Sequence, residues 1–300
     1  MSFKSPFALP NTLGIAFNLA AVFTFSLMDL LAKHLIGQEY HPLQVTWARY
    51  SGQTVLILVL ILPRARMAFR TRRPGLQLLR SILQFSTNAL FFLSLGYIGL
   101  AEATAIADLS PMLIALGAAA FFGEKLGPRR IMAILLAMIG AMLIIRPGTD
   151  VFHPASLLAL GCAVAFAGFV LITRRMGGAD SMWTSLLYSG LLGTLMVSTV
   201  QWFVWKPIQT ADLWGFILIG GLGTISQLCI IRAYSFADAS VIAPIGYFGI
   251  VFASVWGVVI LGESLPFLTI VGALVIIGSG LYVWHRERRI EKMAQGSNGQ

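Results

Sequence analysis

The stretch AEATAIADLSPMLIALGAAAFFGEKL, residues 101–126, decides the class of fold. Its run from 101 to 122 is almost entirely apolar and has the length of about 20 residues that a helix needs to cross the hydrocarbon core of a membrane. Gly123 then interrupts the run. A second stretch of the same kind, ADASVIAPIGYFGIVFASVWGVVILGESL, occupies residues 237–265. The sequence therefore predicts a membrane-spanning helix at corresponding places in two halves of the chain.

The composition extends this prediction to the whole chain. Of the 300 residues, 57% are hydrophobic and 11% are charged, and the mean hydropathy is +0.82, whereas a soluble domain has about 25% charged residues. We expect an all-α integral membrane protein with ten transmembrane helices and no large soluble domain. The ten apolar runs cover residues 13–33, 43–62, 76–98, 101–122, 128–145, 154–173, 182–204, 213–235, 238–261 and 266–284.

The basic residues alternate between the two sides of the membrane. Fifteen of them fall in the termini and in every second loop, and only Lys33, Arg146 and Lys206 fall on the opposite side. Short loops rich in Lys and Arg stay in the cytoplasm. We therefore expect a multi-pass protein of the cell inner membrane with both termini cytoplasmic, and the net charge of +9 needs no nucleic-acid partner to explain it.

Short motifs recur in the same order in both halves. Tyr50-Ser51-Gly52 recurs as Tyr188-Ser189-Gly190, Gly123-Glu124 as Gly262-Glu263, and the start of residues 101–126 resembles the start of residues 237–265. A repeat of five spans inserts its second copy upside down, and transporters with alternating access are often built from such inverted-topology repeats. We expect a cytoplasmic segment at 1–12, repeats at 13–147 and 148–285, and a disordered cytoplasmic tail at 286–300.

These residues resemble the ten-helix EamA-type branch of the drug/metabolite transporter superfamily over about residues 12–285. The resemblance rests on the two Gly-Glu motifs and on Ala48-Arg49-Tyr50, Ser110-Pro111, Arg232-Ala233-Tyr234 and Ala243-Pro244. It implies a secondary transporter, and the family includes amino-acid and metabolite exporters as well as carriers for nucleotide-like molecules, sugars and amines. Gly249-Ile250 stands where many relatives have an acidic residue followed by Pro, so the role of that pair does not transfer.

Other classes of function lack their signatures. The chain has no Walker-type sequence for ATP and no His-Glu-x-x-His metal motif, and Cys162 and Cys229 lie in apolar runs. We expect no enzyme, cofactor or metal site, and a small-molecule substrate exported across the bilayer, with amino acids as the leading class. A carrier for nucleotide-like molecules or amines is the alternative, and a membrane-embedded enzyme or a channel is the rival from another class. The sequence leaves monomer and homodimer open.

Two sets of uncharged polar residues are candidate substrate ligands. Gln84 and Asn88 follow Arg80 at intervals of four, so the three share one helical face. Thr224, Ser226 and Gln227 occupy the corresponding span of the second half, and the spacing of 139 between Asn88 and Gln227 suggests an amide pair. The alternative is that these groups only join neighbouring helices, and that Arg80 extends to the cytoplasmic interface.

Charged residues inside the spans are candidates for ion pairing or coupling. Asp29 has Lys33 at i+4, which favours a local ion pair. Arg49 is expected either to pair with Asp29 or Asp108 or to hold a substrate carboxylate. Asp108 stands next to a helix break predicted at Pro111, where a substrate amine or a proton can bind. Tyr247, close to a second break at Pro244, is a further candidate for the substrate cavity.

Overall fold

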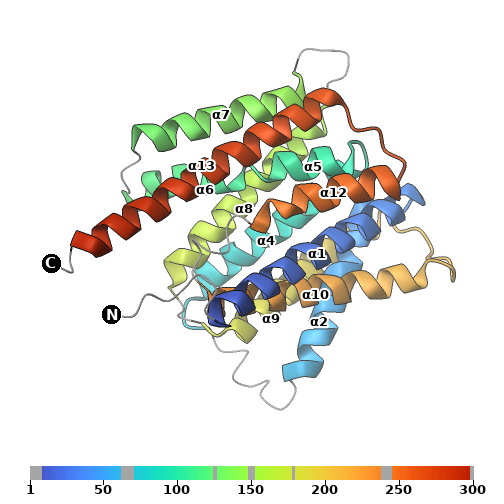
Figure 1. Cartoon of the computed structure of the whole chain (residues 1–300). Coiled ribbons are helices and arrows are strands. Elements are labelled where there is room, and N and C mark those ends of the chain that lie inside the picture. The colour runs from blue at the N-terminus through green and yellow to red at the C-terminus, as the bar shows by residue number, and fades with distance from the viewer. Residues whose placement is uncertain are drawn as a thin grey trace.

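The computed structural model of the chain describes residues 9–61, 71–123, 127–147, 153–177, 180–237 and 245–297, and within these ranges all regular structure is α-helical (Figure 1). The helices of the first half are α1 (Leu9–Gly37), α2 (Pro42–Ile61), α4 (Pro74–Leu95), α5 (Leu100–Ala107), α6 (Ser110–Phe122) and α7 (Pro128–Ile145). Those of the second half are α8 (Ser156–Met176), α9 (Met182–Gln201), α10 (Leu213–Phe236), α12 (Phe248–Val259) and α13 (Phe267–Ser297).

Local residues explain where many helices begin and end. Pro74 and Pro128 begin α4 and α7, where the missing N–H and the fixed φ of proline cost nothing. Gly123 and Gly177 end α6 and α8 with φ of 69° and 57°, a left-handed conformation that glycine adopts without strain. Ser181 caps α9 by accepting a hydrogen bond from the backbone N–H of Thr184 at 3.1 Å.

Each of the ten predicted spans overlaps a described helix, with span four divided into α5 and α6. By length and composition six helices can cross a membrane: residues 12–37, 74–95, 100–122, 156–176, 182–201 and 213–236. Shorter apolar helices cover 131–145, 248–259 and 267–282. α13 continues as far as Ser297 and so extends into the segment that is expected to form the cytoplasmic tail. The reason lies in the residues that follow the span, which are mostly strong helix formers such as Arg, Glu, Lys, Met, Ala and Gln.

The helices pack in pairs that join the two halves. The most extensive contacts are α1 with α10, α4 with α8, α7 with α13 and α2 with α9, and α7 and α13 run side by side along one edge of the bundle (Figure 1). The interface of α7 with α13 and that of α2 with α10 depend on glycine. A Cβ on Gly140 would lie 2.8 Å from the carbonyl oxygen of Gly272, and one on Gly52 would lie 2.8 Å from the Cα of Gly220. The backbones of α7 and α13, and of α2 and α10, therefore cross in direct contact.

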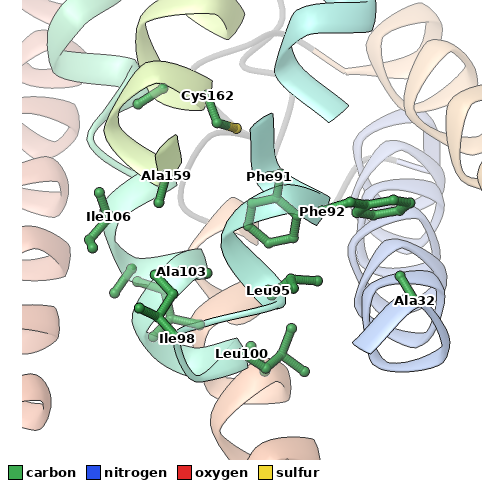
Figure 2. Close-up of a cluster of buried hydrophobic side chains, with 14 of the residues drawn as sticks. Ala32, Phe91, Phe92, Leu95, Ile98, Leu100, Ala103, Ile106, Ala159 and Cys162 are labelled. Carbon is green, nitrogen blue, oxygen red and sulfur yellow. The ribbon is translucent and has the colours of Figure 1, made fainter. Parts of the chain in front are cut away.

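The main hydrophobic cluster lies where the two halves meet. It contains Ala32 of α1, Phe92 and Leu95 of α4, Ile106 of α5 and Cys162 of α8, and Figure 2 shows these side chains gathered around the turn between α4 and α5. This cluster therefore joins α1, α4, α5 and α8, which come from both halves of the chain.

Candidate functional site

Arg49 is the most deeply buried cation of the described residues. Its side chain is 1% exposed, and a Cβ on Gly223 of α10 would lie 3.3 Å from its Nε, so the glycine makes room for it. Nε donates to the sulfur of Met28 at 3.3 Å, and the guanidinium carbon lies 4.8 Å from the centroid of the Tyr50 ring. Nη1 has no hydrogen-bond partner, which is a costly state for a buried charged group.

The expected ion pair between Asp29 and Lys33 is not formed. Lys33 instead pairs with Glu263 at 3.3 Å and donates to the carbonyl oxygens of Leu95 and Ile98, both at 2.7 Å. These three acceptors take all three protons of the ammonium group. Lys33 therefore has no donor left for Asp29 at position i−4. Asp29 makes no hydrogen bond or ion pair within the described ranges, and Arg49 is the cation whose charge acts on it.

The expected direct pair between Arg49 and either acid is likewise absent from the described part of the chain. Asp108 lies between α5 and α6, and its Oδ2 is buried without a partner. Pro111 begins α6 and has no N–H to donate to Ala107. The thiol of Cys162 lies within electrostatic range of both Asp29 and Asp108, and the hydroxyl of Tyr247 within range of Asp108. Pro244 lies outside the described residues.

On the polar face of α4, the amide of Asn88 is hydrogen-bonded to neighbouring groups, whereas Gln84 keeps a side-chain oxygen without a partner. The Nδ2 of Asn88 donates to the hydroxyl of Tyr50 at 2.9 Å and to the carbonyl of Gln84 at 2.8 Å, and Tyr50 donates to the same carbonyl at 3.0 Å. Asn88 therefore joins α4 to α2. The Oε1 of Gln84 is buried without a partner, which makes Gln84 the better ligand candidate of the two.

The second polar set mainly serves helix packing. Thr224 donates to the carbonyl of Gly220 at 2.7 Å. The hydroxyl of Ser226 lies within hydrogen-bond distance of the hydroxyl of Thr24 of α1, at 2.8 Å, and of the carbonyl oxygen of Leu222, at 2.7 Å. Gln227 makes no side-chain hydrogen bond in the described part of the chain, and the expected amide pair with Asn88 is not formed. Gln227 thus stays a ligand candidate, whereas Thr224 and Ser226 have their donors engaged.

Arg80 does not extend to the interface as the alternative interpretation expected. It is 9% exposed and donates to Thr173, Ser189 and the carbonyl of Ser185, and its guanidinium lies 4.7 Å from the centroid of the Phe169 ring. These partners from α8 and α9 hold it inside the bundle.

Sequence reasoning missed two glutamines, both fully buried. The Oε1 of Gln53 and both amide atoms of Gln77 lack partners. A uniform search for amides within the apolar runs would have found both, Gln53 in the second span and Gln77 at the start of the third.

Comparison with known proteins decides the family. The model of the EamA-like transporter family matches residues 12–146 and 153–284, which is nearly the whole chain. The chain belongs to the EamA-like transporter family. It is thus a transporter of the drug/metabolite transporter superfamily and not an enzyme, and its fold holds two EamA domains in one chain.

Several curated relatives of this EamA protein are metabolite transporters. The S-adenosylmethionine uptake transporter of Rickettsia prowazekii is 24% identical over 92% of this chain and 94% of its own. The pseudopaline exporter CntI of Pseudomonas aeruginosa is 28% identical over 88% and 93%, and the riboflavin transporter of Vibrio cholerae 28% over 92% and 94%. A crystal structure with 19% identity matches the fold with a TM-score of 0.61 over 91% of this chain and 98% of its own.

Proposed function

We propose that this EamA protein is a secondary transporter that moves amino acids or related small metabolites out of the cell by alternating access. One observation supports the mechanism above others. When α1, α2, α4, α5 with α6, and α7 are exchanged for α8, α9, α10, α12 and α13, the contact of α1 with α10 becomes that of α8 with α4, and the contacts of α2 with α9 and of α7 with α13 map onto themselves. A pseudo-two-fold arrangement produces this pattern, and it gives one scaffold two near-equivalent states.

The same proposal includes the topology and the repeat boundaries. Repeats at 13–147 and 148–285 follow from the exchange of helices, and the excess of basic residues in alternate loops supports cytoplasmic termini in the inner membrane. In Figure 1 the first turn of α1 and the last turn of α13 lie toward the same end of the bundle, which agrees with an even number of spans.

The proposed site combines polar residues from both halves of the chain. Gln84, Gln227, Asp108 and Tyr247 are the proposed substrate ligands, with Thr224 and Ser226 beside them, while Arg49 and Asp29 supply charge. Buried polar atoms without partners at Gln84 and Asp108 support this assignment, because such atoms are costly unless a ligand or water meets them. Pro111 keeps the backbone at Asp108 broken.

A panel of labelled substrates in proteoliposomes tests the proposal. Purified full-length protein is assayed for counterflow with amino acids, nucleosides and amines, in both directions and with and without a pH gradient. Saturable counterflow of amino acids supports the proposal. Counterflow of nucleosides or amines alone assigns a different metabolite class, and ohmic current without counterflow contradicts the carrier mechanism.

A further inference from the structure

Arg49 and Asp29 form an unusual pair of opposite charges inside the bundle. Both lie in helices that the sequence predicts to span the membrane, α2 and α1. The Nη1 of Arg49 is buried without a hydrogen-bond partner, and Asp29 makes no hydrogen bond or ion pair within the described ranges. Their charges act on each other, yet no ion pair joins them. An arginine that served only to neutralise an aspartate would bind it through the fork of its guanidinium. Arg49 nevertheless lies beside this part of α1, since its Nε contacts Met28, the residue before Asp29.

The surroundings of Arg49 indicate which chemical group its guanidinium can bind. Nε is engaged by the sulfur of Met28, the ring of Tyr50 lies beside the guanidinium, and Gly223 packs against the side chain. Nη1 has no hydrogen-bond partner, and the side chain is 1% exposed. A planar guanidinium in such a position recognises a carboxylate, with which it forms short charge-assisted hydrogen bonds.

We infer that Arg49 binds the carboxylate of the transported substrate and Asp29 its ammonium group, so that the pair selects molecules that have both groups attached to one carbon atom. This inference rests on the proposed function and names the determinant of its substrate class. Asp108, which Arg49 does not reach, is then free for another role. The remaining polar groups, Gln84 and Gln227, contact the rest of the molecule and tolerate different side chains.

The experiment compares Arg49→Met, Arg49→Lys and Asp29→Asn with the parent in proteoliposomes, with Arg146→Met as the control. The probe is counterflow of the labelled protein amino acids, followed for the one with the largest flux. Its decarboxylated amine and its deaminated acid serve as competitors. We expect the half-saturating concentration to rise about tenfold or more in Arg49→Met and Asp29→Asn, because a buried charge loses its partner. It should change less than twofold in Arg146→Met, and each competitor should inhibit the parent about tenfold less than the intact amino acid.

Thermal unfolding of the substrate-free proteins separates this role from a purely structural one. Arg49→Met should unfold at the same temperature as the parent or higher, since it removes an unpaired buried charge, while the amino acid should no longer raise that temperature. A clear loss of thermal stability, or equal inhibition by the amine or the acid, would overturn the inference. Absence of amino-acid counterflow in the parent would instead overturn the proposed substrate class, and the unfolding result would still decide whether Arg49 is structural.

Discussion

Lys33 and Glu263 join the two halves of the chain through a salt bridge of 3.3 Å that is embedded in helix ends. Lys33 also caps the carbonyl end of α4 at Leu95 and Ile98, and the Oε2 of Glu263 accepts the first backbone N–H of α5, at Leu100, at 2.8 Å. A cation at a helix C-terminus and an anion at a helix N-terminus both suit the helix dipoles. One pair of side chains thus holds α1, the α4–α5 turn and the α12–α13 connection together at one end of the bundle.

Loss of the charge on Glu263 should therefore destabilise the protein. Glu263→Gln removes an ion pair and weakens the hydrogen bond to Leu100, with an expected cost of roughly 2 kcal/mol in the free energy of unfolding. The matched control is Glu39→Gln, because the salt bridge of Glu39 with Lys206 has the same length but its carboxylate is 89% exposed, and such pairs contribute about 0–1 kcal/mol. Thermal unfolding in detergent measures both, and equal losses in the two variants would contradict the structural role of Glu263.

Two glycines provide probes of the membrane topology. A side chain at Gly75 in the first turn of α4, or at Gly37 at the end of α1, would meet no atom within 4 Å, and both positions are exposed. In a background without Cys162 and Cys229, Gly37→Cys should react with an impermeant thiol reagent added to intact cells, and Gly75→Cys should react only after the cells are opened. The reverse pattern would invert the topology that the basic loops predict.

Thr71, a small polar residue shortly before α4, would serve this purpose less well. Its hydroxyl donates to Asp180 at 2.5 Å, and the backbone N–H of Arg72 donates to the same carboxylate at 2.8 Å. A cysteine at this position would remove the hydrogen bond to Asp180 and disturb the structure whose location it is meant to report.

Gln84 and Asn88 should respond differently to truncation. Asn88→Ala removes the hydrogen bond between α4 and Tyr50 and should cost about 1 kcal/mol of stability. Gln84→Leu removes an amide whose Oε1 has no partner, so it should lower amino-acid flux severalfold while the folded yield and unfolding temperature stay near those of the parent. Normal flux in Gln84→Leu would assign the face of α4 to packing.

The elements that hydropathy controls could be predicted from the sequence, and the partners of polar groups could not. The ten apolar runs coincide with helices because burial of backbone groups in lipid leaves no other regular structure for a single segment. Spacing of four suggested Asp29 as the partner of Lys33, but the actual partner is 230 residues away and depends on how the halves dock.

The expected amide pair of Asn88 with Gln227 shows that a constant spacing between two repeats does not predict which residues touch. In the proposed two-fold arrangement, related residues would touch only where they lie near the axis. The direct contact of Gly140 with Gly272 shows how close α7 and α13 approach at their crossing. Asn88 lies away from such a crossing and finds its partners on α2 and on its own helix. Spacing alone gives no distance from the axis, so the sequence could identify the repeat but not the contact.

Asp108 is the acid best placed to couple transport to protons. It stands at the break between α5 and α6, its Oδ2 has no partner, and no cation pairs with it within the described ranges, so nothing there holds it in one charge state through a transport cycle. Asp29, in contrast, is within range of Arg49. Asp108→Asn fixes the neutral form in nearly the same shape. We expect it to abolish accumulation driven by a pH gradient while downhill exchange continues within about twofold of the parent.

The control for this last substitution is Asp212→Asn, in the connection before α10. Asp212 accepts a hydrogen bond from the hydroxyl of Tyr40 at 2.8 Å, which an asparagine oxygen can also accept, so accumulation should persist in this variant. Accumulation is measured in proteoliposomes with an imposed pH gradient, and exchange is measured in the same vesicles without a gradient. Accumulation that survives in Asp108→Asn would remove Asp108 from the coupling step. A parent protein whose downhill flux and accumulation both ignore the gradient would be a uniporter or an exchanger, and the unpaired carboxyl of Asp108 would then be a ligand for the substrate alone.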